Sequence, residues 1–198
     1  NALREQMLGS GDAWNEAAIL YRTNNQSAVI EQALRRRGIP YRIYKGSSFY
    51  DHKEIKDILA YIRLVINPKD DEAFKRVVNY PARGIGDTTV GRIAQLAASQ
   101  GKSMWESVDT LVAEAATLGD AMQKTIARKV TEFVNLIRSL AAVRAEKNLY
   151  DFGLELASRT GILAQYRLEN TPEATSAIDN IEELLNSMQL FSEQCEAE

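Results

Sequence analysis

The sequence IKDILAYIRLVINP, residues Ile55–Pro68, carries a clear helical signal. Its apolar residues recur every three or four positions, which is the period of one face of an α-helix. Asn67-Pro68 ends the pattern, because proline cannot continue a helix and disfavours helical backbone in the residue before it. We therefore expect a buried amphipathic helix whose apolar stripe is Ile55, Ile58, Leu59, Ile62, Val65 and Ile66.

Helical periodicity continues downstream of this stretch. Asp70 or Asp71 is placed to cap a short helix that bears Phe74 and that Pro81 ends. Further helices are predicted at about Thr88–Ser99, Ser103–Thr117, Asp120–Glu146, Tyr150–Thr160 and Pro172–Ser192.

Upstream, strand and helix signals alternate. Ala17–Tyr21 and Tyr41–Tyr44 are predicted as buried strands, and the helix between them ends at Gly38. This order defines a βαβ unit with parallel strands. The predicted fold class is thus mainly α, with a partial α/β layer of one βαβ unit followed by a helical domain. Such a unit normally belongs to a larger sheet, so we expect its apolar faces to stay exposed or to pair with a second copy of the chain.

Composition limits the chemistry. Cys195 is the only cysteine and His52 the only histidine, which excludes an intrachain disulfide, a zinc-type ligand cluster and a catalytic cysteine with two histidines, so no metal site is predicted. No run of about 20 apolar residues suggests a membrane span, and no secretion signal is evident, which fits the cytoplasm. Acidic residues are plentiful, so a carboxylate-based hydrolase stays open as an alternative.

The charge is unevenly distributed along a chain whose net charge is −3. Arg35–Arg63 holds eight basic residues against three acidic ones, whereas Glu146–Glu198 holds three against eleven. A local basic surface for nucleic acid is compatible with this pattern, and so are ordinary solvated helix faces. An all-helical protein-interaction domain with an acidic surface is a second alternative.

The first segment with chemical potential is Ala18–Ser27, where a strand signal passes into a loop before a helix. Ligands commonly bind at such an edge. Tyr21 is able to stack on a nucleobase there, and Arg22 is able to stabilise the charge on a phosphoryl group. Alternatively, Tyr21 packs against the helix and Arg22 is solvated.

The second segment is Phe49–Asp57, in which an aromatic pair leads into a charged helix start. Phe49 and Tyr50, with Lys53 beside them, are of the type that stacks on single-stranded bases next to a phosphate track. The same pair would also serve as a hydrophobic plug of the core.

The third segment is Pro81–Thr89, where a Gly-x-Gly sequence precedes a predicted helix. Glycines let successive backbone N–H groups point outward, and the helix N-terminus adds partial positive charge, so a phosphate can be held there. A plain tight turn is the simpler alternative. The candidate DNA-contacting residues are Arg83, Gly84, Ile85, Gly86, Thr88 and Thr89.

Taken in order and spacing, these segments resemble the UvrD, PcrA and Rep family of superfamily one DNA helicases. The dense match covers about Ala17–Ile93, and weaker similarity follows at Arg159–Leu163 and Asn180–Leu185. The matching residues are Tyr21–Asn24 with Gln26-Ser27, Gly38–Tyr41, Phe49-Tyr50 with Glu54–Asp57, Asn67-Pro68 with Asp70-Asp71, and Pro81 with Arg83–Gly86.

The resemblance implies a motor that hydrolyses ATP with Mg²⁺ while moving 3′ to 5′ on single-stranded DNA at a duplex junction, in DNA repair or replication. Residues 1–70 would then belong to the second RecA-like motor domain and residues 71–198 to the helical domain inserted in it. By the same resemblance, Tyr21 would stack on adenine, Arg22 would be the arginine finger, and Gly84–Gly86 would form a duplex-contacting turn of helix-hairpin-helix type.

Several features depart from the family pattern. Lys45-Gly46 stands before the aromatic segment, where the family often has a glycine pair. Ala28 stands where the family usually has arginine, and the sequence holds neither a phosphate loop nor an apolar strand ending in Asp-Glu for magnesium. We therefore expect a helicase fragment that does not hydrolyse ATP alone, has no cofactor bound and at most binds duplex DNA weakly.

Overall fold

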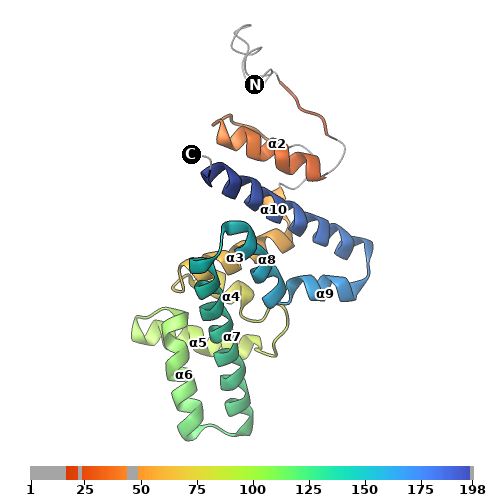
Figure 1. Ribbon diagram of the computed structural model, residues 1–198. Helices are drawn as coiled ribbons and strands as arrows, with labels where there is room; N and C mark the ends of the chain where they lie inside the picture. Colours follow the sequence, from red (N-terminus) through yellow and green to blue (C-terminus); the bar gives the residue numbers. More distant parts are fainter. Residues whose placement is uncertain (1–16, 22–23, 44–48, 197–198) are drawn as a thin grey trace. The chain divides into compact units, whose positions relative to one another are not determined.

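The computed structural model describes residues 17–21, 24–43 and 49–196. These residues are mainly helical, which confirms the predicted fold class at that level (Figure 1). The chain divides into two compact units, Asn1–His52 and Lys53–Glu198. This division reflects packing, and the domain boundary after residue 70 stays a prediction.

The first unit contains the predicted helix, α2 (Asn24–Arg36), and a short 3₁₀ helix, η2 (Phe49–Asp51). Gly38 follows α2 with a φ of 63°, a left-handed conformation that favours glycine and ends the helix as expected. Glu31 of α2 is buried and accepts hydrogen bonds from the Tyr41 hydroxyl at 3.0 Å and from the Phe49 N–H at 3.2 Å. These bonds tie two points in the part of the unit that follows α2, Tyr41 and Phe49, to the helix.

The two predicted strands are not observed in the described residues. Residues 17–21 and 41–43 have no regular secondary structure, and Tyr44 lies outside the described ranges. A strand is held by hydrogen bonds to a neighbouring strand, and the described residues contain no neighbouring strand. Apolar side chains remain exposed here, with Leu20 at 94% and Val29 at 57% of their full accessibility.

The second unit is a stack of helices that begins with α3 (Lys53–Ile66) and the short α4 (Asp71–Val77). The remaining helices are α5 (Asp87–Gln100), α6 (Met104–Leu118), α7 (Ala121–Glu146), α8 (Leu149–Arg159), α9 (Ile162–Glu169) and α10 (Pro172–Glu196). All but α9 were predicted from the sequence, with ends that differ by a few residues. In Figure 1, α7 runs from one end of this unit, where α5 and α6 lie, to the other end, where α8 lies.

The core of this unit forms where α7 packs on α3, α6 and α8, and where α10 covers α3, α8 and α9. The stripe predicted in Ile55–Pro68 is largely buried, although Ile66 is 57% exposed. Phe74 of α4 meets Phe133 of α7 edge to face, with ring centroids 5.7 Å apart. Among the helices that the structure describes, none is both long and apolar enough to cross a membrane.

Asp70 is the N-cap of α4. The sequence alone allows Asp70 and Asp71 as alternatives for this cap. Its carboxylate accepts the Ala73 N–H at 3.0 Å and pairs with Arg63 at 2.7 Å. The bond from the Ala73 N–H, together with Arg63, lowers the pKa of Asp70 below its usual 3.8. Asp71 instead accepts the Met104 N–H at 2.8 Å, which joins the starts of α4 and α6.

We expect Asp70→Ala to lower the free energy of unfolding by about 1 kcal/mol, because α4 loses its cap. Since the folded-state pKa lies below the unfolded value of 3.8, this stabilisation is fully present above that pH and is lost as the pH falls through the folded pKa. Urea unfolding at pH 7 and at acidic pH measures both effects. A difference between wild type and variant that grew as the pH fell would contradict the capping role.

Candidate nucleic-acid interface

The turn between α4 and α5 is anchored in the core by its central residue. Ile85 has no solvent exposure, whereas Gly84 and Gly86 on either side of it are exposed. Gly84 has a φ of 70°, which an L side chain rarely adopts, and Gly86 is the N-cap of α5 without a side-chain cap. The peptide bond between Tyr80 and Pro81, which leads into the turn, is cis.

Asn79 accepts hydrogen bonds from some of the backbone N–H groups of the turn and not from others. Its Oδ1 accepts the N–H of Arg83 at 2.8 Å and the N–H of Ile85 at 3.0 Å. The N–H groups of Gly84 and Gly86 have no acceptor among the described residues. The turn therefore directs alternate amides inward to Asn79 and leaves the two glycine amides available to a ligand.

The start of α5 extends this set of donors. The N–H groups of Asp87 and Thr88 also have no acceptor in the described parts of the chain, as is usual in the first turn of a helix. Thr88 is exposed and Thr89 half-buried beside them. An array of amides at the positive end of a helix favours an anion such as phosphate.

The Arg83 guanidinium is used within the protein. It donates to the carbonyls of Val77 at 3.2 Å, Pro81 at 3.0 Å and Thr160 at 3.0 Å. It also lies 5.5 Å from the centroid of the Phe133 ring. Arg83 thus joins the turn to the end of α8 and to α7, and its predicted DNA contact stays a prediction.

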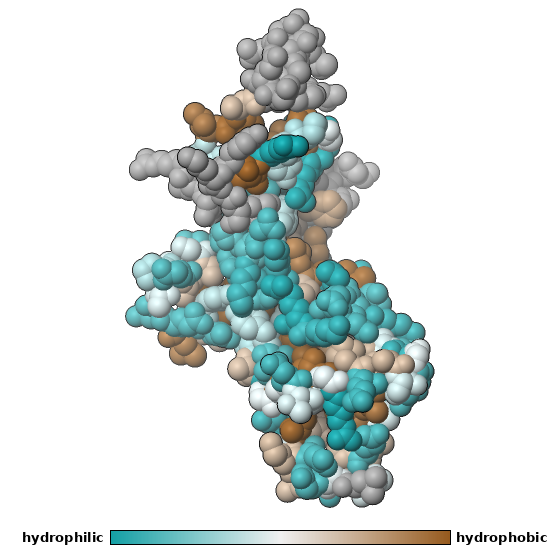
Figure 2. Space-filling view, turned by 180° about the vertical axis from the view of Figure 1, so that it is seen from behind, coloured by the Kyte–Doolittle hydropathy of each residue, from teal (hydrophilic) through white to brown (hydrophobic). Residues whose placement is uncertain are grey.

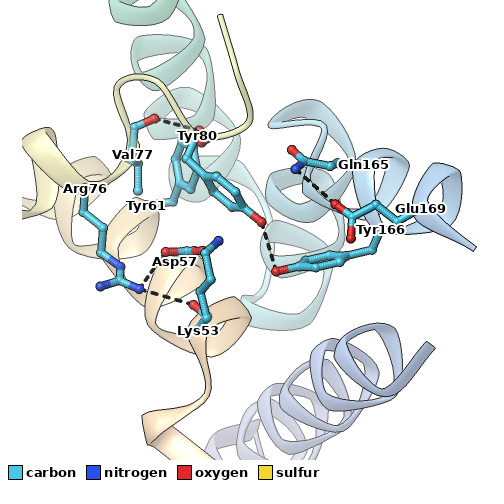
Figure 3. A network of polar contacts seen from close by, with 9 residues as sticks. All are labelled: Lys53, Asp57, Tyr61, Arg76, Val77, Tyr80, Gln165, Tyr166 and Glu169. Carbon is cyan, nitrogen blue, oxygen red and sulfur yellow. Dashed lines mark hydrogen bonds and ion pairs between the residues drawn. The ribbon is translucent and has the colours of Figure 1, made fainter. Parts of the chain in front are cut away.

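Lys53 lies in a polar network at the start of α3, seen in Figure 3. Its ammonium lies 2.9 Å from Asp57 and 3.4 Å from the centroid of the Tyr80 ring. Burial lowers the pKa of Lys53, but hydrogen bonds to Tyr80 and Asp57 outweigh this and raise it above the usual value. Buried Asp57 also pairs with Arg76 at 2.8 Å, so one carboxylate holds two cations.

The same network reaches α9 through two tyrosines. The Tyr80 hydroxyl donates to the Tyr166 hydroxyl at 2.9 Å, and the Tyr61 hydroxyl donates to the Tyr80 carbonyl at 2.6 Å (Figure 3). Burial raises the pKa of Tyr61 to about 12. The network therefore fixes the segment before the Gly84 turn against both α3 and α9.

Phe49 and Tyr50, the predicted aromatic pair, contact each other in the first unit. Their rings meet edge to face with centroids 5.4 Å apart, and Phe49 is 2% exposed. The Arg35 guanidinium lies 4.6 Å from the centroid of the Tyr50 ring. Phe49 therefore serves the core of this unit, and half-buried Tyr50 is the member of the pair that is accessible to solvent.

The predicted nucleotide-contacting pair is described only in part. Tyr21 is 38% exposed, and Arg22 lies outside the described residues. The described residues also contain no group of three or more histidine, cysteine, aspartate or glutamate side chains able to hold a metal ion. The roles of Tyr21 and Arg22 stay predictions.

Sequence reasoning missed two residues at the turn, Asn79 and Lys129. Asn79 precedes the Gly-x-Gly sequence by a few residues, and asparagine next to a turn is a recognised signal for side-chain bonding to backbone amides. Lys129 comes from α7, and its ammonium lies against the Cα of Gly84, where a Cβ would collide with it. Nothing in the sequence distinguishes this lysine from the other basic residues of α7.

Hydrophilic residues predominate on the face of the molecule shown in Figure 2, where hydrophobic residues form small separate patches. In the described residues, the exposed turn between α4 and α5 presents backbone N–H donors. A helical unit with such a turn is a class of fold and site suited to contact with a nucleic-acid backbone.

The comparison with known proteins places the chain in a family. The UvrD-like helicase C-terminal domain matches residues 2–198, and the chain belongs to this family. It is 39% identical to DNA helicase II of Escherichia coli (strain K12) over 183 residues, which are 92% of this chain and 25% of that protein. It is 37% identical to the ATP-dependent DNA helicase PcrA of Bacillus subtilis (strain 168) over 184 residues, 92% of this chain and 24% of that protein.

These matches confirm the resemblance inferred from the sequence. The chain spans about a quarter of the length of the curated relatives that it matches.

Proposed function

We propose that this chain is the duplex-contacting part of an ATP-dependent DNA helicase and that the Gly84–Gly86 turn binds the phosphate backbone. The observation that carries the proposal is the clamp of Asn79 on the amides of Arg83 and Ile85, since it leaves the amides of Gly84 and Gly86 without acceptors in the described structure. Backbone amides carry no sequence information, so the contact would position the duplex without reading its bases.

The structure of the turn favours this role over a plain tight turn. A turn that only reversed the chain would gain from bonding its own amides, whereas here two of them stay exposed next to the N-terminus of α5. The buried Ile85 side chain and the bonds of Arg83 hold the turn rigid, which lowers the entropy lost on binding. Thr88 and Thr89, in the first turn of α5, would donate hydrogen bonds from their hydroxyls to the same phosphate strand.

The rest of the proposed activity concerns the whole helicase. We propose that it hydrolyses ATP and moves 3′ to 5′ on single-stranded DNA, in repair or replication and in the cytoplasm. The chain would contribute Tyr21 as the adenine-stacking residue and Arg22 as the arginine finger, whereas the phosphate loop and the magnesium-binding acids would come from sequence outside these residues. ATP with Mg²⁺ would supply the energy for movement.

The chain alone is proposed to lack ATPase activity and to bind duplex DNA weakly. Its sequence holds no phosphate loop, and Tyr21 and Arg22 alone do not form a nucleotide cradle. Phosphate hydrolysis by the purified chain above the level of a blank would contradict this part of the proposal.

Gly84→Ala is expected to weaken duplex binding by the chain roughly fivefold, since a left-handed alanine costs about 1 kcal/mol and relaxes by turning the amide. Adding Gly86→Ala should weaken it further, because a methyl group then lies on the approach to the second amide. Fluorescence anisotropy of a labelled duplex at low salt measures both variants.

Gly91→Ala in α5 is the matched control, because a Cβ at Gly91 meets only open space and the residue is helical. We expect it to bind as wild type does. Circular dichroism establishes that each variant is folded. If folded Gly84→Ala and the double variant bind the duplex as tightly as Gly91→Ala, the turn is not the contact.

A further inference from the structure

The turn has a cationic neighbour that comes from the middle of α7. Phe133 is fixed in the core beneath the Arg83 guanidinium. Lys129 precedes Phe133 by one helical turn, so the two side chains leave α7 on the same side. Because Phe133 lies beneath Arg83, Lys129 lies beside Gly84, the next residue of the turn. Its ammonium lies against Gly84.

Gly84 is the residue that permits this approach. A Cβ at position 84 would displace the Lys129 ammonium from its place, and the φ of 70° separately favours glycine there. The Lys129 ammonium consequently lies beside Gly84, whose own N–H has no acceptor in the described structure. A neutral donor and a full positive charge thus both lie at Gly84.

The charges around Lys129 are unbalanced. A hollow of about 300 Å³ is lined by three cations and one carboxylate, together with the ring of Phe133. The carboxylate, Glu132, pairs with Arg128 at 2.9 Å. Within the described residues, no carboxylate lies within ion-pair distance of Lys129. The cations that line the hollow are Arg83, Arg128 and Lys129.

We propose that Lys129 is a phosphate-binding residue, whose ammonium pairs with a backbone phosphate of duplex DNA held on the Gly84 and Gly86 amides. This inference rests on the proposed function of the turn and adds a contact from a different helix. The amides fix the position of the phosphate oxygens, and Lys129 supplies the charge that neutral amides lack. One condensed counterion of the DNA is then released for this contact.

Anisotropy titrations of a blunt duplex from about 50 to about 200 mM salt test the proposal with the full chain. Lys129→Gln is expected to reduce the slope of log affinity against log salt by about one and to weaken binding roughly tenfold at the lowest salt. Lys129→Arg keeps the charge and is expected to keep the slope. The matched control is Arg144→Gln, which removes one exposed charge from the same helix roughly 22 Å away, at about 1.5 Å per residue.

The outcomes separate this inference from the function of the turn. If Lys129→Gln keeps the wild-type slope while Gly84→Ala still weakens binding, Lys129 is not a contact but the turn is. An equal loss in Lys129→Gln and Arg144→Gln overturns the inference as well, because the effect is then one of net charge. If wild type binds no duplex even at the lowest salt, the proposed function and this inference fall together.

Discussion

Phe133→Ala is expected to lower the free energy of unfolding by about 4 kcal/mol, the largest effect that we predict for this chain. The ring is 1% exposed and lies edge to face with Phe74, so its removal leaves a cavity between α7 and α4. The Arg83 guanidinium loses the ring beside it at the same time. We therefore expect Phe133→Ala to lower the stability of the fold and also to loosen the packing of the Gly84 turn.

Urea unfolding followed by circular dichroism measures this loss. Phe133→Leu, which keeps most of the buried volume, is expected to cost roughly 1 kcal/mol. Met122→Ala is the surface control on the same helix, because Met122 is 72% exposed, and it should change stability by less than about 0.5 kcal/mol. A Phe133→Ala variant as stable as Met122→Ala would show that the packing between α4 and α7 is not as described.

Helices were predictable from the sequence where one face is apolar over several turns. Those of Lys53–Ile66 and Ala121–Glu146 have long apolar stripes; Asn67-Pro68 ends the first, and the cap Asp120 starts the second. The helix of Ile162–Glu169 was missed because it is short, buries only Ile162 and Tyr166, and begins at a left-handed Gly161 without a side-chain cap. Its helical state depends on packing against α8 and α10.

The two predicted strands show the opposite difficulty. Ala17–Tyr21 has the composition of a buried strand. A strand needs a neighbouring strand to form its hydrogen bonds, and the composition of one segment does not show whether such a neighbour is present. The described residues show 17–21 without regular structure and Leu20 almost fully exposed. Local sequence therefore indicated a preference that the described structure does not realise.

The candidate site was predictable only as far as local geometry reaches. The Gly-x-Gly sequence indicated an exposed backbone turn before α5, and the structure has one there. The long-range partners could not be read from the sequence, because Lys129 and Thr160 meet the turn through the packing of α7 and α8. The same packing decides which side chains at the turn remain free to bind a ligand.

Arg83→Ala is the second large effect that we expect, a loss of about 3 kcal/mol in the free energy of unfolding. Three carbonyls, those of Val77, Pro81 and buried Thr160, lose a charged donor together. Urea unfolding measures the loss. Arg83→Lys keeps the charge but cannot reproduce the planar fork of donors, so it should recover only a small part of the stability.

Duplex binding by the same variants distinguishes two roles of Arg83: holding the turn in position, or contacting a phosphate directly. If Arg83 acts by holding the turn, Arg83→Ala weakens binding while the salt slope of the remaining binding stays as in wild type, and Arg83→Lys is nearly as weak. If Arg83 instead touches a phosphate, the slope falls by about one and Arg83→Lys restores it without restoring stability. The three carbonyl bonds favour the first result, because they occupy most of the N–H donors of the guanidinium and hold it against Val77, Pro81 and Thr160.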